Sequence, residues 1–342
     1  MKYFIPIVFS LVIISNISSC IPERCDGYMT NRGNWARQPD LKMADRTEAV
    51  SFTIGNSVYV GTGWDGVNTR FGDFWKYNPT LGTWEQIAGL PSGAERNSAV
   101  GFSILGFGYC GTGFDGSHYL NDFYKYDPGT NAWTKISSVL PGNPRSEAVA
   151  FAVSDTGYVG TGYDGSAAMS DFYKYDAVND HWTAIPFEGQ PRYGAVSIVF
   201  SNSAYVVTGA NGQGFPADFW VFNFYNYPSA WHRLNDISNS SSDSYDDAYS
   251  TITRRNGSVF VLGNYAYLSG GENNISYTST WEYDFSSDLW FAKTPFEGSP
   301  TTGAVGFSTK NKGFIASGKN DVGVSAQFWE FQPDAVENPN DN

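Results

Sequence analysis

The stretch Val58-Tyr-Val-Gly-Thr-Gly-Trp-Asp-Gly66, with Asp73-Phe-Trp-Lys-Tyr77 and Trp84 after it, decides the fold of this 342-residue chain. The same pattern occurs twice more along the sequence. The second copy comprises Gly108-Tyr-Cys-Gly-Thr-Gly-Phe-Asp-Gly116, Asp122-Phe-Tyr-Lys-Tyr126 and Trp133, and the third comprises Gly157-Tyr-Val-Gly-Thr-Gly-Tyr-Asp-Gly165, Asp171-Phe-Tyr-Lys-Tyr175 and Trp182. An internal repeat of this length predicts a fold assembled from copies of one structural unit.

Six repeats follow one another, and each opens on a short pair that begins with alanine. These pairs are Ala49-Val50, Ala99-Val100, Ala148-Val149, Ala195-Val196, Ala248-Tyr249 and Ala304-Val305. Enrichment in β-branched and aromatic residues between turn residues predicts four short strands in each repeat. In the first repeat we expect these strands at Ala49–Ile54, Ser57–Gly61, Asp73–Tyr77 and Trp84–Ala88.

The two ends of the repeat array predict how it closes. Four-stranded units that cannot bury both faces alone must stack, and radial stacking produces a β-propeller. The sixth repeat stops at Gln332-Pro333 without a fourth strand that carries a tryptophan, and the missing strand is the one around Trp35. We therefore predict an all-β, six-bladed β-propeller over residues 33–334, with four strands per blade, the last blade closed by an N-terminal strand, and a disordered tail over residues 335–342.

The repeat resembles the kelch repeat, which builds kelch propellers and the central domain of galactose oxidase. The resemblance rests on an apolar strand that ends in a glycine motif, followed by a tyrosine and by a tryptophan seven residues later. Four pairs keep this spacing, namely Tyr77 and Trp84, Tyr126 and Trp133, Tyr175 and Trp182, and Tyr283 and Trp290. The resemblance implies the fold but leaves the function open, because kelch propellers serve unrelated tasks.

The first residues have the composition of a processing signal. A short basic start precedes the apolar run from Phe4 to Ile14, and Ile17-Ser-Ser-Cys20 resembles the lipobox of bacterial lipoproteins. We expect a signal peptide over residues 1–19, lipidation of Cys20 and a lipid-anchored tether over residues 20–32. The protein would then lie in the cell envelope, on the outer membrane or the periplasmic face, with the lipid as its only membrane anchor. An ordinary secretory signal with a chance cysteine is the alternative.

Charge and residue inventory argue against several classes of function. A formal net charge of -13 without any Lys/Arg cluster disfavours a nucleic-acid partner. The histidines, at His118, His181 and His232, and the mid-strand Cys110 cannot converge into the His/Cys/Tyr site of a copper-radical oxidase. No Ser-His-Asp arrangement or zinc-ligand spacing exceeds chance. We expect no metal, no cofactor and no catalytic residues of these classes.

Charged residues recur at the innermost end of the face that should carry the long loops. The residues three positions before the opening pairs of the first five repeats are Arg46, Arg96, Arg145, Arg192 and Tyr245. The acids one position before a pair are Glu48, Glu147 and Asp247. A ring of these groups at the channel mouth suits an anionic or polyhydroxylated ligand, because arginine makes bidentate bonds to carboxylates. The alternative is that each arginine pairs with an acid of an adjacent blade, such as Asp73.

Aromatic residues next to carboxylates lie outside that ring. Trp64, Phe114 and Tyr163 each precede an aspartate, and Tyr265 belongs to an apparent excursion of the fifth repeat, 265–279. Aromatic faces beside carboxylates suit sugar rings, which offer C–H groups to stack and hydroxyls to bond. The alternative is that these aromatics pack between blades. The departures from the repeat favour a binding edge between blades four, five and six.

These patterns predict a module that binds a glycan or a protein ligand through its long-loop face. A second hypothesis comes from resemblance alone. Some bacterial six-bladed kelch propellers interconvert sialic acid isomers with an Arg and a Glu in the channel mouth, and this chain has those residue types there. The alternative function is therefore an enzyme like a sialic acid epimerase or mutarotase, in which Arg holds a carboxylate and Glu moves a proton.

Overall fold

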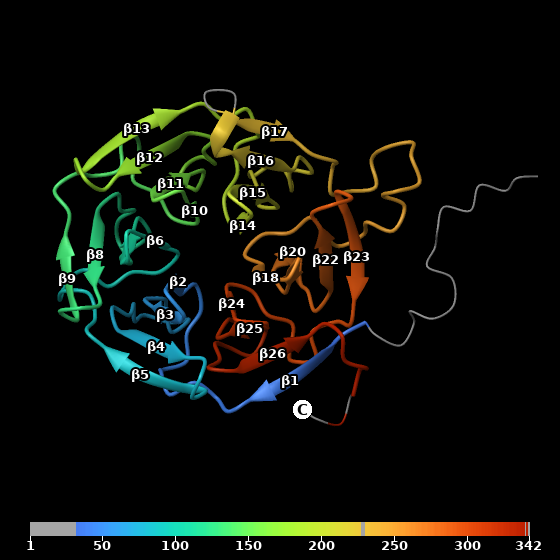
Figure 1. The fold of residues 1–342 in the computed structure, drawn as a ribbon, viewed down its shortest axis with the longest axis horizontal. Coiled ribbons are helices and arrows are strands. Elements are labelled where there is room, and N and C mark those ends of the chain that lie inside the picture. The colour runs from blue at the N-terminus through green and yellow to red at the C-terminus, as the bar shows by residue number, and fades with distance from the viewer. Residues whose placement is uncertain (1–31, 227–229, 339, 341–342) are drawn as a thin grey trace, which may run out of the picture.

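The computed structural model describes residues 32–226, 230–338 and 340. Within these residues, six four-stranded antiparallel sheets stand around a central channel, which Figure 1 views end on. A further hairpin of two short strands extends from the fifth sheet. The predicted all-β class, the six blades and the four strands per blade are confirmed.

The first three blades follow the chain in order from the channel outward. Blade one contains β2 (Val50–Ile54), β3 (Ser57–Gly61), β4 (Phe74–Asn78) and β5 (Thr83–Ile87). Blade two contains β6 (Val100–Ile104), β7 (Phe107–Gly111), β8 (Phe123–Asp127) and β9 (Ala132–Lys135). Blade three contains β10 (Val149–Val153), β11 (Thr156–Gly160), β12 (Phe172–Asp176) and β13 (His181–Ile185).

The other three blades depart from the simple repeat. Blade four contains β14 (Val196–Phe200), β15 (Ser203–Val207), β16 (Trp220–Asn223) and β17 (Trp231–Arg233), with the 3-10 turn η1 (Phe224–Asn226) after β16. Blade five contains β18 (Ser258–Leu262), β19 (Tyr265–Ser269), β22 (Thr280–Asp284) and β23 (Leu289–Lys293), and the hairpin of β20 (Glu272–Asn273) and β21 (Ile275–Ser276). Blade six contains β24 (Val305–Thr309), β25 (Lys312–Ala316), β26 (Phe328–Gln332) and β1 (Asn34–Gln38).

The hydrophobic core lies between neighbouring blades. Phe52 and Phe74 of blade one pack with Tyr124, Tyr126 and Cys110 of blade two, and equivalent clusters fill the other interfaces. The second strand of a blade is buried along most of its length because adjacent sheets cover both of its faces. Cys110 is fully buried, as predicted for a small apolar residue in this strand.

Glycine is required where an aromatic side chain of one blade packs against the backbone of the next blade. A Cβ on Gly108 would lie 2.2 Å from the ring of Phe52 in blade one. The same close approach recurs between Gly157 and the ring of Phe102, at 2.3 Å. A larger residue would force the blades apart, which explains the Gly-Tyr dipeptide in the second strands of blades two and three.

The N-terminal strand closes the ring, as predicted. β1 pairs antiparallel with β26 and places Trp35 opposite Phe331, so the first strand of the described chain is the outermost strand of blade six (Figure 1). Trp35 is fully buried, and its ring contacts those of Phe260, Phe296 and Phe331. Blade six is therefore built from both ends of the propeller sequence.

The expectation for the fifth repeat was wrong. The innermost strand of blade five is β18, which begins at Ser258, and not a strand at Ala248-Tyr249. Gly263-Asn264 is the turn between β18 and β19, and Gly270-Gly271 follows β19 where Thr62-Gly63 follows β3. The alanine-led pair misled the alignment because blade five begins on Gly257-Ser258 instead. The apparent excursion at 265–279 is therefore a core strand followed by the β20–β21 hairpin.

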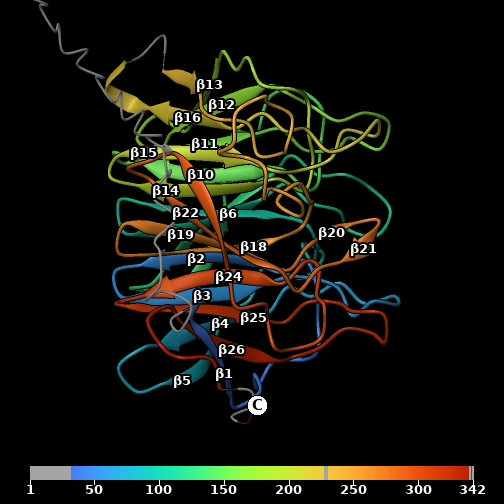
Figure 2. The same cartoon turned by 90° about the vertical axis from the view of Figure 1, so that its right-hand side faces the viewer.

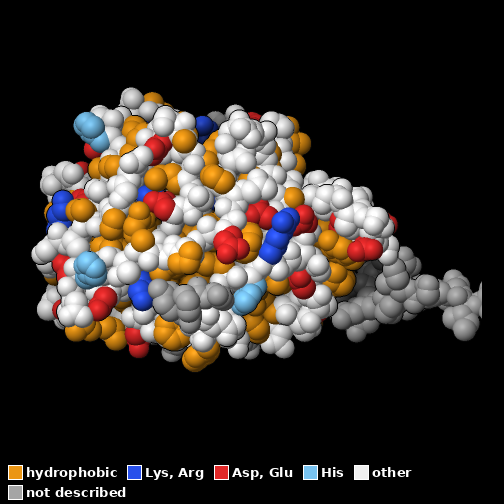
Figure 3. Space-filling view, turned by 90° about the horizontal axis from the view of Figure 1, so that it is seen from above, with side chains coloured by type: hydrophobic (Ala, Val, Ile, Leu, Met, Phe, Trp, Pro, Cys, Tyr) orange, Lys and Arg blue, Asp and Glu red, His pale blue; other side chains and the backbone are white. Residues whose placement is uncertain are grey.

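The loops on the two faces differ in length. The β20–β21 hairpin projects beyond the blade strands on one face in Figure 2, the face where the β17–β18 connection also arises. On the outer rim seen in Figure 3, hydrophobic side chains lie in small separate groups among polar ones. None of the helices formed by the described residues is long and apolar enough to cross a membrane.

Candidate functional site: the channel mouth

At the mouth of the channel, each blade contributes one residue to a closed ring of backbone hydrogen bonds. The ring residues are Glu48, Ser98, Glu147, Gly194, Asn256 and Gly303. Each donates its N–H to the carbonyl oxygen of the ring residue in the preceding blade, at 2.7–3.0 Å, and Glu48 completes the circle by donating to Gly303. All six have a positive φ between 50° and 65°. The ring joins the six blades at the axis.

The side chains of the ring alternate between larger residues that carry a carboxylate or an amide and small residues. Blades one, three and five contribute Glu48, Glu147 and Asn256, whereas blades two, four and six contribute Ser98, Gly194 and Gly303. A Cβ on Gly194 would lie 2.6 Å from Asn256 Oδ1 and 3.0 Å from Glu147 Oε2. The absence of a side chain at Gly194 therefore leaves space toward which two acceptor oxygens converge. A cavity of about 150 Å³ is lined by these ring residues.

Glu48 is held by blade two. Its Oε2 accepts hydrogen bonds from Asn97 Nδ2 and Ser98 Oγ, both at 2.5 Å. These bonds fix the direction of the carboxylate and link the first two blades above the backbone ring. No described residue donates to its Oε1.

Glu147 has the least satisfied side chain of the ring. Its Oε2 is buried and has no hydrogen-bond partner among the described residues. Burial and the negative charges of Glu48 and Glu272 raise the pKa of Glu147 to about 7, against the opposing effect of Arg255. A carboxyl group with this pKa holds or releases a proton near neutral pH.

On one side the ring opens into a wider cavity, the channel-mouth pocket, over blades five, six and one. Its volume is about 340 Å³. The lining residues are Thr47, Glu48, Glu147, Arg255, Asn256, Glu272, Ser276, Thr302, Gly303, Lys319, Asn320 and Asp321. Arg255 forms an ion pair with Glu272 at 2.7 Å, and both side chains remain about one-third exposed. The pocket thus has Glu48 and Glu147 at the channel axis, and its wall holds two cations, Arg255 and Lys319, and two further carboxylates, Glu272 and Asp321.

The four arginines predicted to face the channel do not do so. Arg46, Arg96, Arg145 and Arg192 are at most 1% exposed. Their ion-pair partners are Asp73, Asp122, Asp171 and Asp218, each in the same blade as its arginine. The pairing alternative was therefore right, except that the partner is not in an adjacent blade. Each guanidinium also donates to the carbonyl of a threonine after the second strand, so it joins the ends of strands two and three.

Sequence reasoning missed a fifth member of this series, Arg254. It is fully buried, but it donates to backbone carbonyls and to Ser279 Oγ, because no aspartate precedes β22. Burial lowers the pKa of Arg254 to about 9. The misplaced fifth repeat hid both Arg254 and its neighbour Arg255, which is the arginine that reaches the pocket. The sequence did contain a signal for the correct alignment: Arg254 stands four positions before Ser258, as Arg46 stands four positions before Val50.

The predicted aromatic residues form contacts between blades. Trp64, Phe114 and Tyr163 are half-buried. The guanidinium of Arg70 lies between the first two, 5.3 Å from the Trp64 ring and 5.5 Å from the Phe114 ring. Tyr163 contacts the ring of Tyr193 at 5.2 Å. These contacts agree with the alternative that the aromatic residues pack between blades.

Two members of this aromatic set border the channel-mouth pocket. Lys319 Nζ lies 5.4 Å from the centre of the Trp64 ring, and the Arg255 guanidinium lies 5.6 Å from the centre of the Tyr193 ring. Both cations line the pocket. Trp64 and Tyr193 therefore lie behind the two cationic side chains and do not line the cavity themselves, and Tyr193 was not among the predicted residues.

Three further predicted residues do not line the pocket. Tyr245 and Asp247 lie in the connection between β17 and β18, where the Tyr245 ring contacts Tyr249 at 6.0 Å. Tyr265 opens β19 directly after the Gly263-Asn264 turn, on the opposite face from the channel mouth. All three were placed at the binding face because the start of the fifth repeat was aligned nine residues too early.

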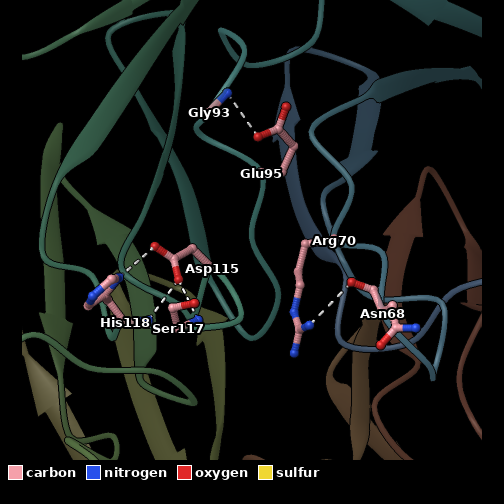
Figure 4. Close-up of a pocket in the computed structure, with 7 residues that line it drawn as sticks. All are labelled: Asn68, Arg70, Gly93, Glu95, Asp115, Ser117 and His118. Carbon is pink, nitrogen blue, oxygen red and sulfur yellow. Dashed lines mark hydrogen bonds and ion pairs between the residues drawn. The ribbon is translucent and has the colours of Figure 1, made fainter.

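A second cavity, the rim pocket, lies between blades one and two and is shown in Figure 4. Its volume is about 540 Å³, and it is lined by Asn68, Arg70, Gly93, Glu95, Asp115, Ser117 and His118. Its carboxylates are engaged locally, since Asp115 accepts the N–H groups of Ser117 and His118 at 2.7 Å and Glu95 accepts that of Gly93. Local turn contacts thus account for these side chains, which makes the channel-mouth pocket the stronger candidate.

Metal ligands do not gather in the described ranges: they contain no group of three His, Cys, Asp or Glu side chains placed to hold an ion. Around the channel-mouth pocket, the side chains instead offer four carboxylates, two amides, three hydroxyls and two cations. This set can form hydrogen bonds to a polar ligand and can transfer a proton through Glu147.

The fold and the channel mouth define a class, a six-bladed β-propeller. The family model described as the kelch motif matches residues 45–91 and 113–140, which cover blade one and the outer half of blade two. The chain is therefore a β-propeller that carries kelch motifs.

Many solved structures are similar to this chain, and 715 of their chains match it. One of them, the "Structure of YjhT", has a TM-score of 0.70 and 15% sequence identity, over 84% of this chain and 95% of that chain. At that identity the likeness concerns the fold alone. No curated protein matches the sequence. The function has to be argued from the site.

We expect the stability of the protein to depend on pH through Glu147. Because the folded pKa is raised to about 7 from an ordinary value of 4.5, the folded state binds more protons than the unfolded state between these values, and stability falls as the pH rises through them. The variant Glu147→Gln should lack this decrease of stability with pH. Chemical denaturation at pH 5 and pH 8 should show the variant gaining stability relative to the parent at pH 8.

The matched control is Glu85→Gln, which alters an exposed glutamate on β5. It should leave the pH dependence of the parent unchanged. An equal stability difference between Glu147→Gln and the parent at both pH values would contradict the raised pKa.

Proposed function

We propose that the chain is a glycan-binding module and that its ligand enters the channel-mouth pocket. The observation that carries this proposal is the buried, unpartnered Oε2 of Glu147 beside a polar cavity of about 340 Å³. A buried carboxylate oxygen without a donor is costly, and a ligand that supplies the donor removes that cost. Small-molecule sites commonly have volumes of about 300–1,000 Å³.

The chemistry of the lining favours a sugar over an apolar ligand. Hydroxyl, amide and charged groups surround the cavity, and such groups exchange hydrogen bonds with the hydroxyls of a saccharide. Tyr193 and Trp64 contact the two cations of the wall, Arg255 and Lys319, and so help to hold these hydrogen-bond donors in place. The pocket is also open on the long-loop face, so a longer glycan can extend outward.

The raised pKa of Glu147 favours a second candidate, an enzyme that moves a proton on a sugar. In this hypothesis Glu147 is the general base, and Arg255 binds a carboxylate of the substrate. Interconversion of sialic acid isomers, implied by the resemblance to bacterial kelch propellers, needs these two groups. Arg255 takes the role that was expected of the four buried arginines.

We also propose that the chain is exported and carries a lipid on Cys20. Its support is the sequence alone, namely an apolar run followed by small residues and a cysteine. Residues 1–31 lie outside the described part of the structure, so the predicted signal peptide, tether and lipidation site stay predictions. Cell-envelope glycans would be within reach of a protein anchored in this way.

Filling the channel-mouth pocket should abolish glycan binding. Ser276 lines this pocket and Ser117 lines the rim pocket, so Ser276→Trp and Ser117→Trp are matched substitutions. We expect a glycan array to identify ligands of the full chain. Titration calorimetry should then show a loss of at least about tenfold, or about 1.4 kcal/mol, for Ser276→Trp alone. The proposal would be contradicted if the parent bound no glycan on the array, or if both variants lost the same amount of affinity.

The enzyme hypothesis makes its own prediction. If Glu147 is a general base, the parent chain interconverts sialic acid isomers in a reaction that NMR can follow, and Glu147→Gln lowers turnover by about 10²–10⁴-fold. Glu85→Gln should retain full turnover. The absence of turnover by the parent chain would remove this candidate and leave the binding module.

Lipidation predicts a cysteine-specific label. Cells that express the full chain should incorporate radiolabelled palmitate into it, and Cys20→Ser should lose the label and leave the membrane fraction. Cys25→Ser, five residues further on, should behave like the parent. Labelling that survives in Cys20→Ser, or is absent from the parent, would favour an ordinary secretory signal.

A further inference from the structure

The ring at the channel mouth has a quasi-threefold arrangement of acceptors. Glu48, Glu147 and Asn256 come from alternate blades of a six-bladed propeller, with small residues between them. These three residues, which carry acceptor oxygens, line the cavity at the channel axis from alternate blades. A primary ammonium group has three N–H donors with the same threefold symmetry.

We propose that these three side chains bind a primary ammonium group, and that the ligand of the channel-mouth pocket is a sugar with a free amino group. This inference rests on the proposed glycan function and deepens it. The ammonium would lie over Gly194, toward which Glu147 Oε2 and Asn256 Oδ1 converge. Glu48 would supply the third acceptor from the other side of the ring.

The geometry of each acceptor supports a donor-rich ligand group. Glu147 Oε2 is buried without a partner in the described chain, and the Glu48 carboxylate is oriented by Asn97 and Ser98. Asn256 Oδ1 lies toward the space over Gly194, where a donor of the ligand would meet it. An ammonium group would satisfy all three acceptors at once, whereas a single hydroxyl has only one donor to offer.

Electrostatics points the same way. Glu48 and Glu147 come from alternate positions of the ring, and the negative charge of Glu48 contributes to holding a proton on Glu147. A cation between them replaces that proton and removes the repulsion. The cationic side chains, Arg255 and Lys319, lie in the outer wall of the pocket, and Arg255 is already paired with Glu272. Glu272 and Asp321 balance these two cations, so the net negative charge of the cavity lies at the axis, and the hydroxyls of the sugar would meet the outer wall.

The test compares glucosamine, glucose and N-acetylglucosamine by titration calorimetry at neutral pH with the full chain. Charge-assisted hydrogen bonds to two carboxylates should make glucosamine bind at least about tenfold more tightly than either neutral sugar. In Glu147→Gln the three affinities should agree within about twofold. Glu95→Gln, a carboxylate of the rim pocket, should keep the preference of the parent.

A second variant separates loss of binding from loss of fold. Gly194→Ala places a methyl group where the two oxygens converge, and its φ of 62° resembles those of the non-glycine ring residues. It should lose the preference for glucosamine while it keeps the melting temperature of the parent within a few degrees. Retention of the preference in Gly194→Ala or in Glu147→Gln would overturn the ammonium site.

Simple ammonium ions separate this inference from the glycan proposal. Methylammonium, with three N–H donors, should raise the melting temperature of the parent but not that of Glu147→Gln, and tetramethylammonium, with none, should raise neither. If sugars bind without preference and methylammonium has no effect, the ammonium site is wrong and the glycan function stands. If methylammonium stabilises the parent but no sugar binds, the ammonium site stands and the glycan function is wrong.

Discussion

The pairing of β1 with β26 is the constraint on which the other features of this propeller depend. A blade can bury its second strand only if sheets stand on both sides of it, so an array of six blades is satisfied only when the last blade meets the first. The strand around Trp35 completes blade six, and its buried ring packs against blade five. Closure then brings six loops from distant parts of the sequence to one axis, where their backbones form a circle of hydrogen bonds.

That backbone circle separates the scaffold from the site. Its hydrogen bonds use only main-chain atoms, and its residues share a left-handed conformation that glycine or asparagine adopts most easily. Four of the six positions nevertheless carry a side chain other than glycine, including Glu48 and Glu147. The scaffold does not require a carboxylate there, so these two residues are better explained by a ligand than by the fold. The Arg–Asp pairs are instead explained by the fold, because they recur in four blades and join the ends of strands.

Repetition made the fold predictable and the site partly so. Where blades one to three repeat almost residue for residue, the strands could be placed within one or two residues, and the ring positions Glu48 and Glu147 were found by counting from Ala-Val pairs. Where blade five departs from the repeat, the same counting failed. It selected Tyr245 and Asp247 instead of Arg254 and Asn256, because an alanine-led pair lies in the long connection before β18, and Arg255 was missed with them.

The sequence by itself determined the all-β class, the number of blades and the closure by an N-terminal strand, because hydrophobic periodicity and repeat spacing are local properties of the chain. Only the tertiary structure decided which charged groups face the channel. An arginine at the end of a loop turns inward to an aspartate or outward to a cavity according to contacts with residues about 26 positions away, as for Arg145 and Asp171. The state of Glu147 likewise depends on Glu48 and Arg255, which come from other blades and meet it only after the ring has closed.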